Sequence, residues 1–256
     1  MTITSSRNAR LKQIRSLRRR RRRERAGAFV AEGEDLLAAA DAAGWVPRER
    51  YCAAGSGLPG VEVEPELLRA TAGLASGTRA LAVYEERWLK APIGPLCVYL
   101  HGVRDPGNVG TIVRAAHAFG ASCVALGPGS ADPFSPKAVR ASMGAIFHVP
   151  LARALAVGAL PGVRVALVSD HGLELWNAVR QIASAVGDRS AGAIQATATG
   201  GEEGVTLIVG GERRGVTKDA LAAADLRARI PIRGDSLNAA MAATVALYEL
   251  SRIARA

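Results

Sequence analysis

The chain has 256 residues, of which 49% are hydrophobic, so it is long enough to build a substantial core in one large domain or two small ones. Its formal net charge is +10, and the excess is concentrated at one end. Residues 1–25 hold eleven lysines and arginines and one acid, so this segment alone carries +10. Such a basic block predicts a polyanionic partner, with a solvated helix face or a targeting tract as the alternative.

The composition disfavours several classes of protein. The cysteines Cys52, Cys97 and Cys123 stand far apart and form no CxxC pair, so the sequence predicts neither a disulfide framework nor a metal site. No apolar run is long enough for a membrane span, and the N-terminus lacks the apolar segment of a secretory signal. We therefore expect a cytoplasmic protein, although an arginine-rich start is also typical of a mitochondrial presequence. Aromatic residues make up only 4% of the chain, which predicts a core of small aliphatic side chains.

Residues 1–90 predict a small basic α/β domain. Apolar residues at helical spacing predict a helix over 6–25, and arginines occupy every face of its second half. Shorter elements follow: a strand at 29–32, a helix at 34–44, a strand at 48–53, a helix at 65–72 and a strand at 79–85. The proline-containing stretch 87–95 predicts a linker. We therefore expect two domains, 1–90 and 91–256.

From residue 96 onward, predicted strands and helices alternate regularly. The strands are 96–100, 122–126, 163–170, 205–210 and 226–232, and the helices are 108–119, 135–146, 175–186, 218–224 and 236–254. This alternation predicts a parallel sheet that is covered by helices on both faces. Residues 187–204 have no periodicity and predict a loop.

Three segments place polar groups just beyond the carboxyl ends of predicted strands, where open parallel sheets bind ligands. The first is DPGNVGTIVRAAHAFGA (105–121), in which Asn108 is the expected helix cap and Arg114 lies on the second turn. The second is LIVGGERRGV (207–216), in which a strand ends in paired glycines that Glu212 follows.

The third segment is IPIRGDSLNAAMAATVALYEL (230–250). A strand ends at Ile232, and Ser236 is expected to begin the last helix, with Leu237 and Asn238 in its first turn. Taken singly, each polar residue has a structural interpretation as a helix cap or a solvated acid. The run GGERRGVT imitates a phosphate-binding P-loop, but Val216 stands where the lysine is needed, so we exclude that function.

Together the three segments resemble the signature motifs of the SpoU/TrmH branch of the SPOUT methyltransferases: the NxGxxxRxAxxFG block, the GxExxG block and the IPI…SLN block. Residues 134–151 resemble the linking segment of that family, and residues 5–37 resemble the ribosomal-protein-like substrate-binding domain of its ribosomal RNA members. The resemblance implies a C-terminal α/β SPOUT domain with a parallel sheet and a deep trefoil knot, preceded by a small α/β RNA-binding domain. It also implies a homodimer whose active site draws on both subunits.

The activity that this resemblance implies is transfer of a methyl group from S-adenosylmethionine to a ribose 2′-hydroxyl of RNA, with 23S ribosomal RNA as the favoured substrate. A tRNA ribose methyltransferase and a non-catalytic rRNA-binding assembly factor are the alternatives. Backbone at Gly210, Ile230 and Leu237, with Ile232 adjacent, is expected to hold the donor. The expected catalytic residues are Arg114, Asn108, Glu212, Ser236 and Asn238, and the expected RNA-binding residues are Arg7, Arg18, Arg19, Arg20, Arg21, Arg22 and Arg23.

Arg114 is the residue expected nearest to the acceptor. A guanidinium group stays protonated in proteins, so Arg114 is a poor proton acceptor. We expect it instead to hold the neighbouring phosphate through paired hydrogen bonds and to stabilise the alkoxide that develops. Asn108 and Asn238 are expected to orient the ribose or Arg114, and Glu212 is expected to position Arg114 or Asn238.

Overall fold

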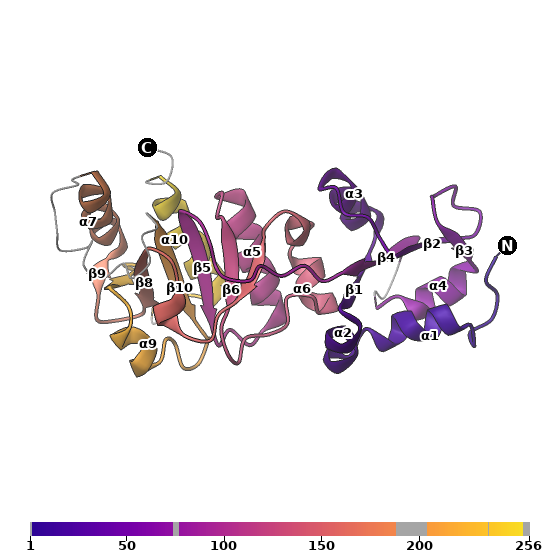
Figure 1. Cartoon of the computed structure of the whole chain (residues 1–256), viewed down its shortest axis with the longest axis horizontal. Helices are drawn as coiled ribbons and strands as arrows, with labels where there is room; N and C mark the ends of the chain where they lie inside the picture. Colours follow the sequence, from indigo (N-terminus) through magenta and orange to yellow (C-terminus); the bar gives the residue numbers. More distant parts are fainter. Residues whose placement is uncertain (1, 74–76, 188–203, 235, 253–256) are drawn as a thin grey trace. The chain divides into compact units, whose positions relative to one another are not determined.

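The computed structural model describes residues 2–73, 77–187, 204–234 and 236–252, which form two compact units (Figure 1). The first unit combines Met1–Arg87 with Asp132–His148, and the second combines Trp88–Ala131 with Val149–Ala256. Most of the loop expected at 187–204 lies outside the described residues. Within the described part of the chain, no helix is both long and apolar enough to cross a membrane.

The first unit is built on a four-stranded sheet in the order β1-β4-β2-β3 (Figure 1). Strands β1 (Ala28–Glu32) and β2 (Glu49–Ala53) run antiparallel to β4 (Ala80–Glu85), and β3 (Val61–Val63) runs parallel to β2. The helices of this unit are α1 (Ala9–Ser16), α2 (Arg20–Ala26), α3 (Glu34–Ala42) and α4 (Pro65–Thr71). Strand β3 was not predicted, because three residues are too few to show an alternating pattern.

The single helix predicted over 6–25 is wrong, because the structure has two helices there. Arg19 has an extended backbone between α1 and α2, with φ −91° and ψ 128°. The side chain of Arg23 donates hydrogen bonds to the carbonyl oxygens of Leu17 and Arg18 at the end of α1. Carbonyls at the end of a helix have no partner within it, so the arginine that follows the break satisfies them.

The two faces of this sheet have cores of different composition. Leu11, Ile14 and Leu17 of α1 pack with Leu68 of α4 in an aliphatic cluster. A second cluster is aromatic and consists of Phe29, Trp45, Tyr84, Phe134 and Phe147, with neighbouring ring centroids 4.7–6.3 Å apart. The prediction of a core made only of small aliphatic side chains is therefore wrong for this unit, because several of the few aromatic residues pack together in one cluster.

Residues 132–148 belong by their contacts to the first unit, although the sequence assigned them to the second domain. Helix α6 (Pro136–Ala141) packs on β1, and the 3-10 turn η1 (Ala145–Phe147) packs on α3. The helix predicted at 135–146 ends early because Met143 and Gly144 have positive φ angles of 49° and 89°. A β-carbon at Gly144 would lie 2.6 Å from the side chain of Ala39, so this approach to α3 requires glycine.

The second unit is a seven-stranded sheet in the order β7-β6-β5-β10-β8-β11-β9, and every pair of neighbouring strands is parallel. The parallel sheet that the alternation predicted is therefore confirmed. Figure 1 labels its strands β5, β6, β8, β9 and β10. The strands are β5 (Leu96–His101), β6 (Cys123–Leu126), β7 (Leu151–Arg153), β8 (Val163–Val168), β9 (Leu173–Glu174), β10 (Val205–Gly210) and β11 (Leu226–Arg229). Strand β11 ends earlier than predicted, because Pro231 has no N–H group to continue the ladder.

Helices cover both faces of this sheet. Helix α10 (Ala239–Ser251) packs against α5 (Pro106–Ala118), β10 and α7 (Leu175–Gly187). On the other face, Ala220 of α9 (Lys218–Ala222) and Val157 of the 3-10 turn η2 (Val157–Ala159) join a cluster with Tyr99 and Ile208. The loops after β5, β10 and β11 consequently leave the same edge of the sheet, and these loops carry the three motifs.

Candidate active site

A chain of side-chain hydrogen bonds joins the three motifs. The Asn108 amide nitrogen donates to Glu212 Oε1 at 2.6 Å. The Asn238 amide nitrogen donates to Asn108 Oδ1 at 3.1 Å. Three residues that are far apart in sequence therefore meet at the carboxyl edge of the sheet, as the motifs predicted.

This chain of bonds fixes the orientation of both amides. A carboxylate only accepts hydrogen bonds, so Asn108 must turn its NH₂ group toward Glu212 and its oxygen toward Asn238. Asn238 then donates to that oxygen and turns its own Oδ1 to the backbone N–H groups of Ala240 and Met241, at 2.9 and 3.3 Å. Because every group has its complement, the site is organised before any ligand binds.

Two helix caps differ from the prediction. Asp105, rather than Asn108, caps α5: its Oδ1 accepts from the N–H groups of Gly107 and Asn108 at 2.6 and 3.1 Å. Pro106 occupies the first position of that helix, which favours the preceding residue as the cap. Asn238, rather than Ser236, caps α10, which begins at Ala239. Both asparagines still lie at helix starts, and Ser236 is left exposed at the rim of the pocket described next.

Hydrogen bonding holds Glu212 in its ionised form. Burial raises the pKa of this carboxyl group, but hydrogen bonds from the Asn108 side chain and from the backbone N–H groups of Glu212, Arg104 and Asp105 outweigh that effect. The net result is a pKa below the usual glutamate value. Glu212 is therefore suited to orient Asn108 and poorly suited to accept a proton.

A cavity of about 380 Å³ lies between the ends of β8, β10 and β11 and the start of α10. All four residues predicted to hold the donor line it: Gly210, Ile230, Ile232 and Leu237. Glu212 and Ser236 line it as well, so the catalytic motif residues border the same space. Its backbone-rich wall and apolar side chains match a pocket for an adenosine and a short aliphatic chain.

The paired glycines are required by close backbone approach. A β-carbon at Gly210 would lie 2.3 Å from the carbonyl carbon of Gly215, and one at Gly211 would lie 2.3 Å from the carbonyl oxygen of Gly102. Either contact is far below ordinary van der Waals distance. The loop that follows β10 can therefore fold back against the strand only with glycine at both positions.

Arg114 lies on the exposed face of α5, apart from this network. It is six residues beyond Asn108, which places it about 9 Å further along the helix axis and about a third of a turn around it. Its guanidinium group makes no hydrogen bond or ion pair with any residue that the structure describes. The expected contact between Glu212 and Arg114 is thus absent from the described residues, whereas the one with Asn238 exists through Asn108.

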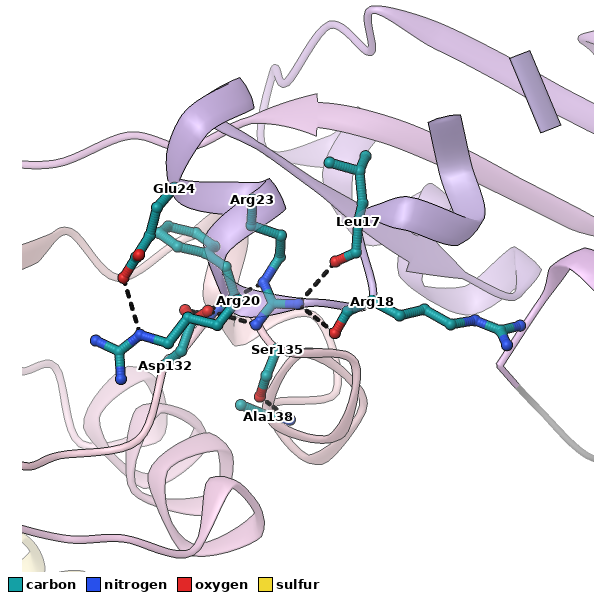
Figure 2. Close-up of polar contacts among 9 residues, drawn as sticks. Leu17, Arg18, Arg20, Arg23, Glu24, Asp132, Ser135 and Ala138 are labelled. Atoms are coloured by element: carbon teal, nitrogen blue, oxygen red, sulfur yellow. Dashed lines mark hydrogen bonds and ion pairs between the residues drawn. The ribbon is translucent and has the colours of Figure 1, made fainter. Parts of the chain in front are cut away.

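One arginine of the basic run is a buried structural residue, which corrects the prediction for Arg23. Its side chain is 3% exposed, and it contacts Asp132 Oδ2 through Nε at 3.0 Å and through Nη2 at 2.6 Å (Figure 2). The same side chain donates to the carbonyl oxygens of Leu17 and Arg18. A group held in this way is not available to RNA.

The other predicted RNA-binding arginines differ in whether their side chains already have partners within the protein. Arg18 donates to the carbonyl oxygens of Thr71 and Ala72. Arg20 pairs with Glu24 at 2.8 Å (Figure 2). The remaining members have exposed side chains for which no ion pair is found among the described residues: Arg7, Arg19, Arg21 and Arg22.

Sequence reasoning missed a second cavity, of about 820 Å³, that the loops after β5, β6 and β10 enclose. His101, Arg104 and Thr217 line it, together with part of the motif that contains Glu212. The signal that would have pointed to these residues is their position just beyond strand ends, the same signal that identified the motifs. Among the residues that the structure describes, no group of three or more His, Cys, Asp or Glu side chains is suited to hold a metal ion.

Comparison with protein families agrees with this geometry. The family model for the SpoU rRNA Methylase family matches residues 95–248, and that for the MRM3-like substrate binding domain matches residues 8–88. The chain belongs to the SpoU rRNA methylase family. It is therefore an S-adenosylmethionine-dependent RNA 2′-O-methyltransferase, as the three motifs predicted.

Full-length relatives share both parts of the chain. The 23S rRNA (guanosine(2553)-2′-O)-methyltransferase RlmP of Bacillus subtilis is 27% identical over 97% of this chain and 98% of its own length. The AdoMet-bound rRNA methyltransferase of Sinorhizobium meliloti has a TM-score of 0.80 and 29% identity, covering 98% of this chain and 97% of that one. The SpoU methyltransferase AviRb of Streptomyces viridochromogenes, also with AdoMet, has a TM-score of 0.77 and 27% identity over 96% and 98% of the two chains. Several other curated relatives match over only about half of their own length.

Proposed function

We propose that this enzyme methylates a ribose 2′-hydroxyl of 23S ribosomal RNA in the cytoplasm. The observation that carries the proposal is the Glu212–Asn108–Asn238 network at the rim of the donor pocket, because hydrogen bonds join one residue from each of the three motifs there. An RNA-binding factor without catalysis has no need to keep three separate motifs joined at such a pocket. The 23S rRNA named for the Bacillus subtilis relative and the match to a substrate-binding domain over residues 8–88 support ribosomal RNA over tRNA.

The residues of this chain divide the chemical work. Bound S-adenosylmethionine supplies an activated methyl group. Backbone at Gly210, Ile230 and Leu237 holds the donor, and the locked amides of Asn108 and Asn238 fix the place where the ribose docks. Such alignment alone is worth several kcal/mol, up to about 7–11 kcal/mol in ideal intramolecular reactions. Arg114 binds the neighbouring phosphate and stabilises the negative charge that develops on the 2′-oxygen.

A homodimer forms part of this proposal. Met241, Val245 and Tyr248 recur at helical spacing on α10, and their side chains are 60%, 41% and 53% exposed. An apolar stripe on a helix is typical of a face that packs against another chain. Helix α5, with the exposed Arg114, packs beside α10, and the rings of Phe119 and Tyr248 meet edge to face. Dimerisation through this face would carry Arg114 toward the donor pocket of the partner.

The deep trefoil knot also belongs to the proposal. It is implied by the resemblance to the SPOUT methyltransferases. The sheet order supports it, because the late strand β10 lies between β5 and β8, which both precede it in the chain. A knot of this type would pack the loops after β10 and β11 against each other around the donor.

Two measurements test the proposed function. Ribosomal RNA from cells with and without this protein should differ by a 2′-O-methylated nucleotide in the 23S species. A difference confined to tRNA would favour the tRNA enzyme instead. Calorimetry with S-adenosylmethionine should show a single donor site per subunit, and absence of binding would favour the non-catalytic assembly factor.

The dimer is tested by complementation between two inactive variants. Arg114→Ala keeps a donor pocket but loses the arginine, and Gly210→Val keeps the arginine but blocks the pocket. Purified heterodimers that carry two different tags should recover part of the wild-type methyl transfer, while each homodimer stays inactive. No recovery in verified heterodimers would place Arg114 and the donor in the same subunit, and a monomer by light scattering would exclude the dimer.

A further inference from the structure

The second cavity adjoins the donor pocket and shares one wall with it. Residues 211–215, the loop after β10, line both spaces. Side chains from three loops line the larger cavity: His101, Arg104, Pro128, Arg213, Arg214 and Thr217. Its volume of about 820 Å³ is in the range of pockets that hold a nucleotide-sized ligand.

The cavity carries an excess of positive charge. Arg104, Arg213 and Arg214 are exposed, and none of them forms an ion pair with a carboxylate within the described ranges. Two carboxylates also line the cavity, Asp105, which caps α5, and Glu212, which accepts from Asn108, so three arginines against two acids leave a net charge of +1. Three guanidinium groups without a carboxylate partner around a concave space favour an anionic ligand.

A polar contact forms part of the cavity wall. His101 Nε2 lies 3.1 Å from the Thr217 hydroxyl, and His101 Nδ1 is buried without a hydrogen-bond partner among the described residues. Burial lowers the pKa of His101, so its ring is neutral at pH 7 and does not add to the charge. The positive potential of the cavity therefore comes from the arginines alone.

We propose that this cavity binds the stretch of RNA that contains the methylated ribose, with Arg104, Arg213 and Arg214 holding its phosphodiester groups. The inference rests on the proposed function and adds a binding site to it. Guanidinium groups match phosphate through paired hydrogen bonds, which fix direction as well as charge. The loop that the two cavities share places this RNA-binding cavity beside the donor pocket.

Arg104 gives the sharpest test, because it lines this cavity and not the donor pocket, whereas Arg213 and Arg214 line both. Arg104→Gln should weaken binding of a 23S rRNA transcript about tenfold and reduce the slope of log K against log salt by about one. Its affinity for S-adenosylmethionine should stay within about twofold of wild type. Arg227→Gln is the matched control, since Arg227 is an exposed arginine of the same unit that lines neither cavity.

RNA affinity is read by filter binding and methyl transfer by a tritiated donor, with the full-length chain in each case. Wild-type RNA affinity and salt slope in Arg104→Gln would overturn the cavity assignment. Loss of donor affinity in that variant would also overturn it, because Arg104 would then serve the donor. If wild-type protein transfers no methyl group to any ribosomal RNA, the proposed function fails, and the binding comparison still decides whether the cavity holds RNA.

Discussion

Gly210→Ala tests the donor pocket by a change of one methyl group. The added β-carbon would lie 2.3 Å from the carbonyl carbon of Gly215 and 2.5 Å from the nitrogen of Val216, where ordinary contact begins at 3.4 Å. The loop over 211–215 must therefore move by about 1 Å, which is more than the range of hydrogen-bond lengths allows for a contact between this loop and the donor. We expect the Kd for S-adenosylmethionine to rise about 100-fold, which corresponds to about 2.7 kcal/mol.

The measurement is titration calorimetry with the donor, together with thermal unfolding. Because the displaced loop is largely exposed, we expect the free energy of unfolding to change by no more than about 1–2 kcal/mol. Gly158→Ala is the control, since a β-carbon at that exposed glycine meets nothing within 4 Å. Wild-type donor affinity in Gly210→Ala would show that this loop does not form the wall of the donor site.

Three further outcomes follow from the contacts. Asn238→Asp keeps a good helix cap but cannot donate a hydrogen bond to Asn108. Its free energy of unfolding should therefore stay within about 1 kcal/mol of the wild-type value while kcat falls. Asn238→Ala removes the cap as well, so both stability and kcat should fall. Arg23→Met should lower the free energy of unfolding by about 3–5 kcal/mol, because the largely covered Asp132 loses its ion pair and the carbonyl oxygens of Leu17 and Arg18 lose their donor; equal stability in denaturant titrations would contradict this. The pKa of Glu212 lies below its ordinary value, so its contribution to stability is complete above about pH 4.5 and is lost as the pH falls through the folded-state value; Glu212→Gln should show no such acid-side loss in unfolding curves.

Much of the catalytic unit could be predicted because its signals are local. Each strand of the parallel sheet is a short apolar run, and each polar motif follows directly on the end of a strand. Chain order together with the carboxyl-edge rule therefore brings Asn108, Glu212 and Asn238 to one edge without knowledge of any distance. The hydrogen-bond partner of each asparagine amide was not predictable from the sequence. It depends on which donors and acceptors remain free after the helix caps have formed.

The features that sequence reasoning missed are decided by contacts between distant residues. Residues 132–148 come shortly after β6, so their sequence pattern predicts one more helix of the catalytic domain. Their place in the first unit depends on Phe134 and Phe147, which complete an aromatic cluster with Phe29 of β1, more than one hundred positions away. Nothing within a local window distinguishes these phenylalanines from those that would pack on the nearer sheet.

The arginine run shows the same limit and has a measurable consequence. Six consecutive arginines are indistinguishable by type, yet Arg23 is neutralised by Asp132, while Arg18 and Arg20 already have partners within the first unit. That leaves Arg19, Arg21 and Arg22 as the exposed members for which the structure describes no side-chain partner. If each phosphate contact contributes about 0.7–0.9 to the slope of log K against log salt, these three account for a slope of about 2–3, where six free arginines would give about 4–5. Replacing only those three by glutamine should therefore remove nearly all of the salt dependence that the run contributes to RNA binding, and a large remaining share would mean that the paired arginines release their partners to bind RNA.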